Sequence, residues 1–171
     1  MAKKSIGLKS IKMGAIAVDG GMGTVLTQVG ATVSDTAALT TEEGTKTDFN
    51  IEESDAPFFS IESAPGRKVL AWSSYDVDLD TLSRFWGGTV AAASGGNGRS
   101  WEMPDTLPVI ERSIEIETKD GWKIQIPRLS LTAKLQWNLQ KTKLAQIDLE
   151  GVILKPEKAG VSATKFIEPV A

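Results

Sequence analysis

The chain has 171 residues, of which 41% are hydrophobic and 24% charged, ordinary values for a globular domain. It contains neither Cys nor His, which excludes disulfides, thiolate or imidazole zinc sites and all catalysis that depends on a histidine base. The formal net charge of −3 offers no basic face for tight DNA or RNA binding. No segment approaches the ~20 apolar residues of a membrane span, so we expect no membrane anchoring.

The N-terminal third carries weak strand signals. Apolar residues recur between positions 6 and 13 and predict a short strand or an arm, and we assign residues 1–12 to an N-terminal arm. Residues 19–24, DGGMGT, predict a turn; they lack the Gly-Lys-Ser/Thr ending of a phosphate-binding loop. Residues 25–33 alternate between apolar and polar or small side chains and predict a second strand.

Residues 34–65 are strongly acidic, with eight carboxylates and a single lysine. Residues 45–51 alternate and residues 58–61 and 69–75 are two more short strand candidates. The acidic composition also marks 34–65 as a long loop-like region, which we read as a solvated acidic loop. The acidic residues do not have the spacing of a calcium-binding loop.

The stretch DVDLDTLSRFWGGTV, residues 76–90, predicts one short helix over about 79–86. The apolar face of this helix is formed by Leu79, Leu82, Phe85 and Trp86. Asp78 is the expected N-cap and Gly87 the expected C-cap. Two turns of helix are not stable alone, so this face must lie on a sheet. The DxDxD pattern that precedes it resembles a metal site, but it lacks the Gly and Glu of a calcium loop.

A hairpin is predicted around Lys119-Asp120-Gly121, with Asp120 and Gly121 in the turn. A three-residue loop places Ile116 opposite Ile124 and Glu117 opposite Lys123. Pro127 then predicts a bend, a bulge or an edge, because proline cannot donate to a sheet.

The next alternating run, residues 129–139, predicts a long strand whose partner is 145–154. We expect Ile147 to face Trp137 and Leu149 to face Leu135, with Trp137 in the core. Gly151 suggests a bulge or burial on both faces. Residues 91–101 are predicted as a Gly-rich loop and residues 155–171 as an extended C-terminal arm.

Together these elements predict a mainly β fold: one domain over 1–171, an antiparallel sandwich or partial barrel of about seven to nine strands with one helix. No residue qualifies as catalytic, cofactor-binding or metal-ligating, and we expect no enzyme activity and no cofactor. Glu115 and Glu117 share a strand face and could flank a glycosidic bond, but alternation with isoleucine is the ordinary pattern of a solvated strand face.

Four stretches resemble the major tail proteins, or tail tube proteins, of long-tailed bacteriophages, which are related to the tubes of contractile injection systems. They are DGGMGT (19–24), DLDTLSRFWGG (78–88), IQIPRLSL (124–131) and GVILKPEK (151–158). Scattered over about three quarters of the chain, they are individually short, and their order and spacing give the resemblance its weight.

The resemblance implies a structural virion protein, made in the bacterial cytoplasm, whose hexameric rings stack into a tube that conducts DNA during ejection. It implies contacts with tape-measure, tail terminator and distal tail proteins, and DNA that passes through the lumen without specific binding. It implies an inter-ring role for the 34–65 region, for which the candidates are Glu42, Glu43, Asp48, Glu52 and Glu53. The candidates for the lumen face are Glu115, Glu117, Gln136 and Asn138.

Two other readings of the sequence remain open. One is a different virion β-protein, for head decoration or tail completion. The other is a carbohydrate-binding or adhesive β-sandwich that uses exposed tryptophans, of which the chain has five.

Overall fold

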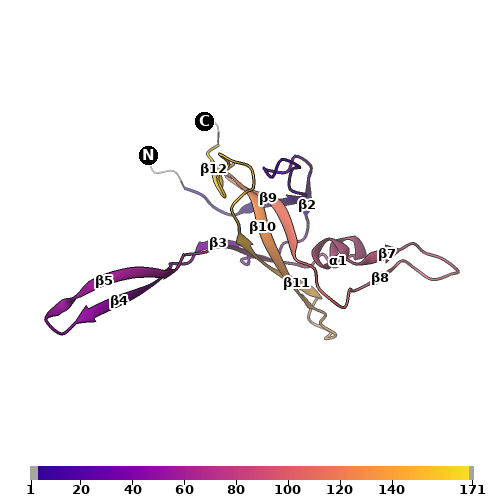
Figure 1. Ribbon diagram of the computed structural model, residues 1–171. Helices are drawn as coiled ribbons and strands as arrows, with labels where there is room; N and C mark the ends of the chain where they lie inside the picture. The colour runs from indigo at the N-terminus through magenta and orange to yellow at the C-terminus, as the bar shows by residue number, and fades with distance from the viewer. Residues whose placement is uncertain (1–3, 170–171) are drawn as a thin grey trace.

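The computed structural model describes residues 4–169 and has one helix, α1 (Leu79–Trp86) (Figure 1). One sheet contains eight strands: β1 (Leu8–Gly14), β2 (Leu26–Val29), β3 (Ala38–Thr41), β6 (Lys68–Ser74), β9 (Ile110–Thr118), β10 (Lys123–Gln136), β11 (Gln146–Ile153) and β12 (Lys165–Ile167). Two hairpins project from it: β4 (Thr45–Ile51) with β5 (Ser54–Ala64), and β7 (Thr89–Ala91) with β8 (Ser100–Glu102).

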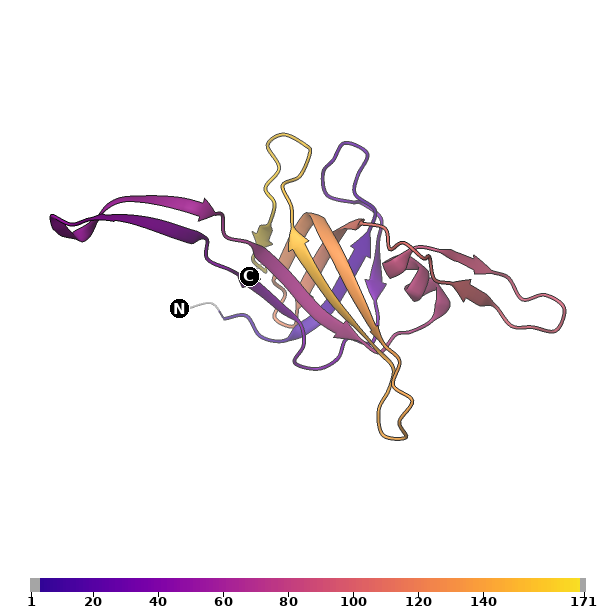
Figure 2. The same ribbon diagram turned by 60° about the horizontal axis from the view of Figure 1, so that its bottom comes forward.

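The eight-stranded sheet curls into a partial barrel. Its strand order is β2-β1-β9-β10-β11-β6-β3, with all pairs antiparallel and β12 added beside the start of β10. The chain that follows β2 then reaches the end of β6: the amide of Val33 donates to the carbonyl of Ser73 (2.8 Å), and the amide of Tyr75 to the carbonyl of Ala31 (3.0 Å). These bonds hold the segment after β2 against the end of β6, and the sheet has the curved shape seen in Figure 2.

The core lies on the inner face of this barrel, and α1 covers one side of it (Figure 2). Alternation along each strand supplies the core, since successive side chains point to opposite faces. The most deeply buried side chains are Ile11, Met13, Leu70, Trp72, Ile114, Ile126, Leu129 and Ile147. The predicted mainly β fold with one helix is therefore confirmed; the barrel sheet holds eight strands, and four more form the two projecting hairpins.

The β9–β10 hairpin has the predicted register. Ile116 pairs with Ile124 and Glu117 with Lys123. Gly121 has φ of 89°, a conformation that L side chains rarely adopt. The register shifts between Ile126 and Leu129, so a bulge lies at Pro127, as expected of a residue that cannot donate.

The predicted pairing of β10 with β11 is wrong by two residues. Ile147 pairs with Leu135, and Leu149 with Ala133. The strand also ends at Gln136 rather than at residue 139, so the side chain of Trp137 is 57% exposed and does not belong to the core.

Gly151 gives the physical reason for this register. A Cβ atom at Gly151 would lie 2.4 Å from Cδ2 of Leu129, so the glycine provides the space that the Leu129 side chain fills. The pairing through Gly151 is regular, and the bulge predicted there is absent from β10–β11.

Four segments predicted as loops or arms contain strand residues. The acidic region 34–65 holds β3 and the β4–β5 hairpin, because its alternating apolar residues pair across a turn at Glu52 and Glu53. Residues 91–101 close a hairpin through β7 and β8. The two arms return to the barrel: within the N-terminal arm, β1 pairs with β2 and β9, and within the C-terminal arm, β12 pairs with β10.

Candidate assembly surfaces

The predicted helix, α1, packs on the core, and both predicted capping residues form their hydrogen bonds. The carboxylate of Asp78 accepts a hydrogen bond from the Thr81 amide (2.6 Å), and the Gly87 amide donates to the Ser83 carbonyl (2.8 Å). Leu82, Phe85 and Trp86 are buried, whereas Leu79 is half-buried at the edge of the core.

The double glycine and the aspartates near α1 also have local roles. Gly88 has φ of 79°, and a Cβ there would lie 2.4 Å from the Glu102 carbonyl oxygen, so only glycine lets β7 approach β8. Asp76 accepts from the hydroxyl of Thr81 (3.3 Å). Asp80 pairs with Arg99, and that hydrogen bond holds the pKa of Asp80 below its ordinary value. The aspartates are thus occupied by structural contacts.

The hairpin of β4 and β5, called the ribbon below (residues 45–64), projects from the barrel into solvent (Figure 1). Its strands are amphipathic. Register and alternation place three large apolar side chains on one face, Phe49, Phe59 and Ile61, and the rings of Phe49 and Phe59 lie 6.2 Å apart. The opposite face carries Lys46 paired with Glu62 and Asp48 paired with Ser60, and alternation places Phe58, which is 72% exposed, on this face as well.

Every residue of the ribbon is exposed, including its apolar face. Phe49 is 52% exposed, Phe59 57% and Ile61 49%. A two-stranded hairpin is marginally stable by itself in water, and a clustered exposed apolar face marks an interaction site. The ribbon therefore has the properties of an element that completes its burial against a partner.

The predicted candidates from the acidic region lie along the ribbon and at its base. Glu52 and Glu53 form the turn at its tip and Asp48 lies on its polar face. Glu42 lies at the base, where its carboxylate pairs with Arg67 (2.8 Å). Sequence reasoning missed the phenylalanines; the alternation on either side of Glu52-Glu53 was the signal that could have identified them.

A second projecting surface follows β10, the basic loop of residues 137–145. The loop is pinned by a hydrogen bond from the Asn138 amide group to the Leu144 carbonyl (2.8 Å). Trp137 is 57% exposed, Leu139 90% and Leu144 66%. Lys141 and Lys143 are also exposed, and the loop contains no acidic residue.

The predicted lumen residues are only partly brought together. Glu115 and Glu117 lie on the outer face of the sheet, where Gln125 donates to Glu115 (2.9 Å) and Lys9 pairs with Glu117 (2.8 Å). The bond from Lys9 lowers the pKa of Glu117. Gln136 shares this outer face at the far end of β10, but Asn138 lies beyond the strand in the basic loop.

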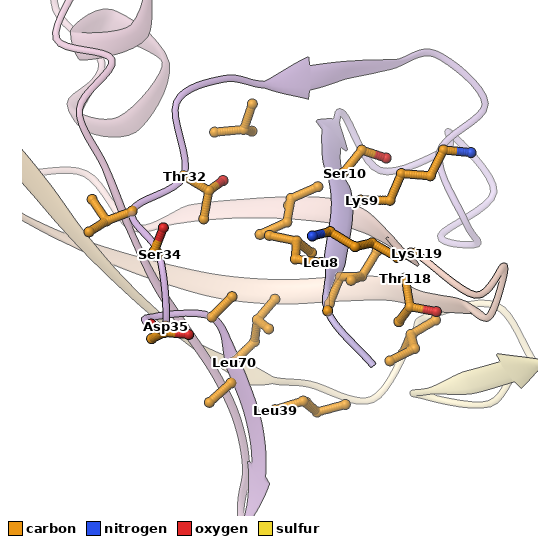
Figure 3. Close-up of a pocket in the computed structure, with 18 of the residues that line it drawn as sticks. Leu8, Lys9, Ser10, Thr32, Ser34, Asp35, Leu39, Leu70, Thr118 and Lys119 are labelled. Carbon is orange, nitrogen blue, oxygen red and sulfur yellow. The ribbon is translucent and has the colours of Figure 1, made fainter. Parts of the chain in front are cut away.

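A cavity of about 620 Å³ opens at the end of the barrel near the β9–β10 turn (Figure 3). Leu8, Leu39 and Leu70 are among its lining residues, together with Lys119 and Asp35. Its lining runs from Thr32 and Val33, beside Ser73 and Ser74, to Leu39 in β3, so the cavity follows the gap between β1 and β3 along the barrel.

The described residues 4–169 include no group of three or more acidic side chains placed to hold a metal ion. Within the same range, no helix is long and apolar enough to cross a membrane.

Among the tryptophans, Trp72 and Trp86 are buried and Trp101 is half-buried, with its indole nitrogen donating to the Gly87 carbonyl (2.9 Å). Trp137 is the exposed one of the five, whereas a sugar-binding platform needs several exposed rings on one surface.

Comparison with family models and with curated proteins gave no match for this chain. The likeness to tail tube proteins therefore rests on the stretches quoted from the sequence.

Proposed function

We propose that this chain is a structural protein that assembles into rings, and that the rings stack into a hollow tube of the bacteriophage-tail type. The observation that carries the proposal is the exposed apolar face of the ribbon. A folded barrel with a buried core has no internal need for a 20-residue projection that exposes three phenylalanines and two isoleucines. Contact with other copies would bury that face.

The sheet edges support the same proposal. In the described sheet, β3 is paired on one side by β6, and β2 is paired along its length by β1. Free edges of this kind invite pairing with another chain unless they are covered. Closure of a ring of copies would cover them, and a closed ring has no remaining edge.

The charge of the chain suits a conduit for nucleic acid. The outer face of the sheet carries carboxylates paired to lysines, as in Glu117 with Lys9, and the net charge is −3. Such a surface would let a polyanion pass without holding it. Under this proposal the outer face at Glu115, Glu117 and Gln136 lines the lumen, and tape-measure and tail-end proteins are the other partners.

Negative-stain electron microscopy of the purified full-length chain tests the proposal. We expect rings with a central hole, and stacks of them at high protein concentration. The matched control removes the ribbon: Thr45 and Ala64 are paired neighbours, so a Gly-Gly link can join Gly44 to Pro65 without moving β3 or β6. This variant should fold and should not stack. Full-length protein that stays monomeric at all concentrations would contradict the proposal.

A further inference from the structure

The ribbon and the basic loop leave the barrel at opposite ends. Within the β6–β11 pair, Ser74 faces Ile147 at one end and Val69 faces Val152 at the other. The basic loop joins β10 to β11 at the Ile147 end. The ribbon follows Thr41, which pairs with Lys68 at the other end. In Figure 2 the ribbon runs to the left of the barrel and the basic loop runs downward.

The two projections carry opposite charge. The ribbon has five carboxylates and one lysine, a net charge of −4, and its tip is Glu52-Glu53 followed by Asp55. The basic loop has Lys141 and Lys143 and no acid. Within the described residues neither lysine has an ion-pair partner. Charge complementarity of this kind selects partners and fixes their orientation.

Both projections also expose apolar groups that suit an interface core. The ribbon offers the adjacent rings of Phe49 and Phe59, and the basic loop offers Trp137, Leu139 and Leu144. Exposed aromatic anchors ringed by charge are the usual centres of binding energy at protein interfaces. The hydrogen bond from Asn138 to Leu144 holds the loop in a defined shape, which reduces the entropy lost on docking.

We propose that the acidic, apolar ribbon of one copy docks on the basic loop of a second copy, head to tail. Complementary surfaces at opposite ends of a subunit make a heterologous contact, which continues from copy to copy instead of closing in a pair. This inference rests on the proposed self-assembly and adds to it the receiving surface and the polarity of the stack.

Charge reversal tests the docking. The ribbon variant is E52K/E53K and the loop variant is K141E/K143E. E52K/E53K makes the ribbon tip positive, like the basic loop, and brings the net charge of the ribbon from −4 to 0. K141E/K143E makes the loop negative, like the ribbon. For each pure variant we therefore expect a fall of about tenfold or more in the fraction of protein that sediments as stacked rings. A 1:1 mixture of the two variants restores an opposite charge at every junction, and we expect stacking to return. Thermal unfolding and the size of single rings should match the unaltered chain.

The matched control is K155E/K165E, which reverses two exposed lysines outside the basic loop and should leave stacking unchanged. If both charge-reversal variants stack like the unaltered chain, or if their mixture stays unstacked, the docking inference is wrong while rings and tubes of the unaltered chain still uphold the proposed function. If the unaltered chain itself forms no rings, the proposed function fails first.

Discussion

The barrel and the ribbon have the same alternation of apolar and polar residues, but the apolar side chains are buried in the barrel and exposed in the ribbon. In the barrel, the inner face buries Ile114, Ile126 and Leu129 beneath α1. In the ribbon, Phe49 and Phe59 alternate just as regularly and yet are 52% and 57% exposed. The comparison indicates that the stability of the barrel comes from its own core, whereas the ribbon depends on another surface. The predictions below change one region at a time.

The largest effect is expected from emptying the core under α1. Replacing Phe85 by Ala should lower the free energy of unfolding by about 3–5 kcal/mol, because the removed ring leaves a cavity against Trp86 and the sheet. Urea unfolding of the purified chain measures it. An unchanged midpoint would show that α1 does not seal the barrel.

The next effect concerns the register of β10 and β11. Gly151→Ala should destabilise the barrel by about 1–3 kcal/mol, since the new methyl group would overlap the Leu129 side chain. Gly98→Ala is the matched control, because nothing lies within 4 Å of a Cβ at Gly98. Equal unfolding midpoints for the two variants would be inconsistent with this packing.

Removing the helix cap should cost less. Asp78→Ala takes away the acceptor for the Thr81 amide and should lower stability by about 1 kcal/mol. Asp78→Asn retains an acceptor oxygen and should recover most of the loss in the same urea titration. If both variants lose the same free energy of unfolding, the effect comes from the negative charge of Asp78 and not from the hydrogen bond that it accepts.

A pH-dependent effect is expected on the outer face of the barrel. The pKa of Glu117 is lowered by the bond from Lys9. A lowered pKa in the folded state stabilises the fold above the ordinary value of 4.5, and this contribution is lost as the pH falls through the lowered pKa. Glu117→Gln should therefore unfold with a shallower dependence on pH below 4.5. If the free energy of unfolding depends on pH in the same way in Glu117→Gln and in the unaltered chain, the bond from Lys9 to Glu117 makes no such contribution.

The smallest effect on the unfolding of the isolated subunit is expected in the ribbon. The double variant F49A/F59A removes exposed rings and should change the free energy of unfolding by no more than about 0.5 kcal/mol. The same variant should fail to stack, which sedimentation measures. A large loss of subunit stability would instead place these rings in the fold of the barrel.

The features that were predicted correctly from the sequence depend on residues close together in the chain. The β9–β10 register follows from one short loop with Gly121, and the helix follows from Asp78, its apolar face and Gly87. The register of β10 and β11 was missed because alternation has a period of two and does not distinguish a shift of two residues. Its determinant is the contact between Leu129 and Gly151, which only the folded chain reveals.

Strand candidates were predicted at residues 45–51 and 58–61, and β4 and β5 contain them, but their pairing into a projecting hairpin was not predicted. Thr45–Ile51 alternates, but nothing in the sequence showed that it pairs with Ser54–Ala64 instead of with the barrel. Trp137 was placed in the core because the apolar phase of β10 continues past Gln136, where the strand ends. The candidate inter-ring residues lie on the ribbon and at its base, and their role between rings stays a prediction.

The central claim is that the ribbon is buried between copies, and hydrogen–deuterium exchange tests it most directly. Peptides covering residues 45–64 should exchange fast in dilute subunits and become strongly protected in assembled protein. Peptides from the core strands should be protected in both. Equal, fast exchange of the ribbon in subunits and in assemblies would contradict the account.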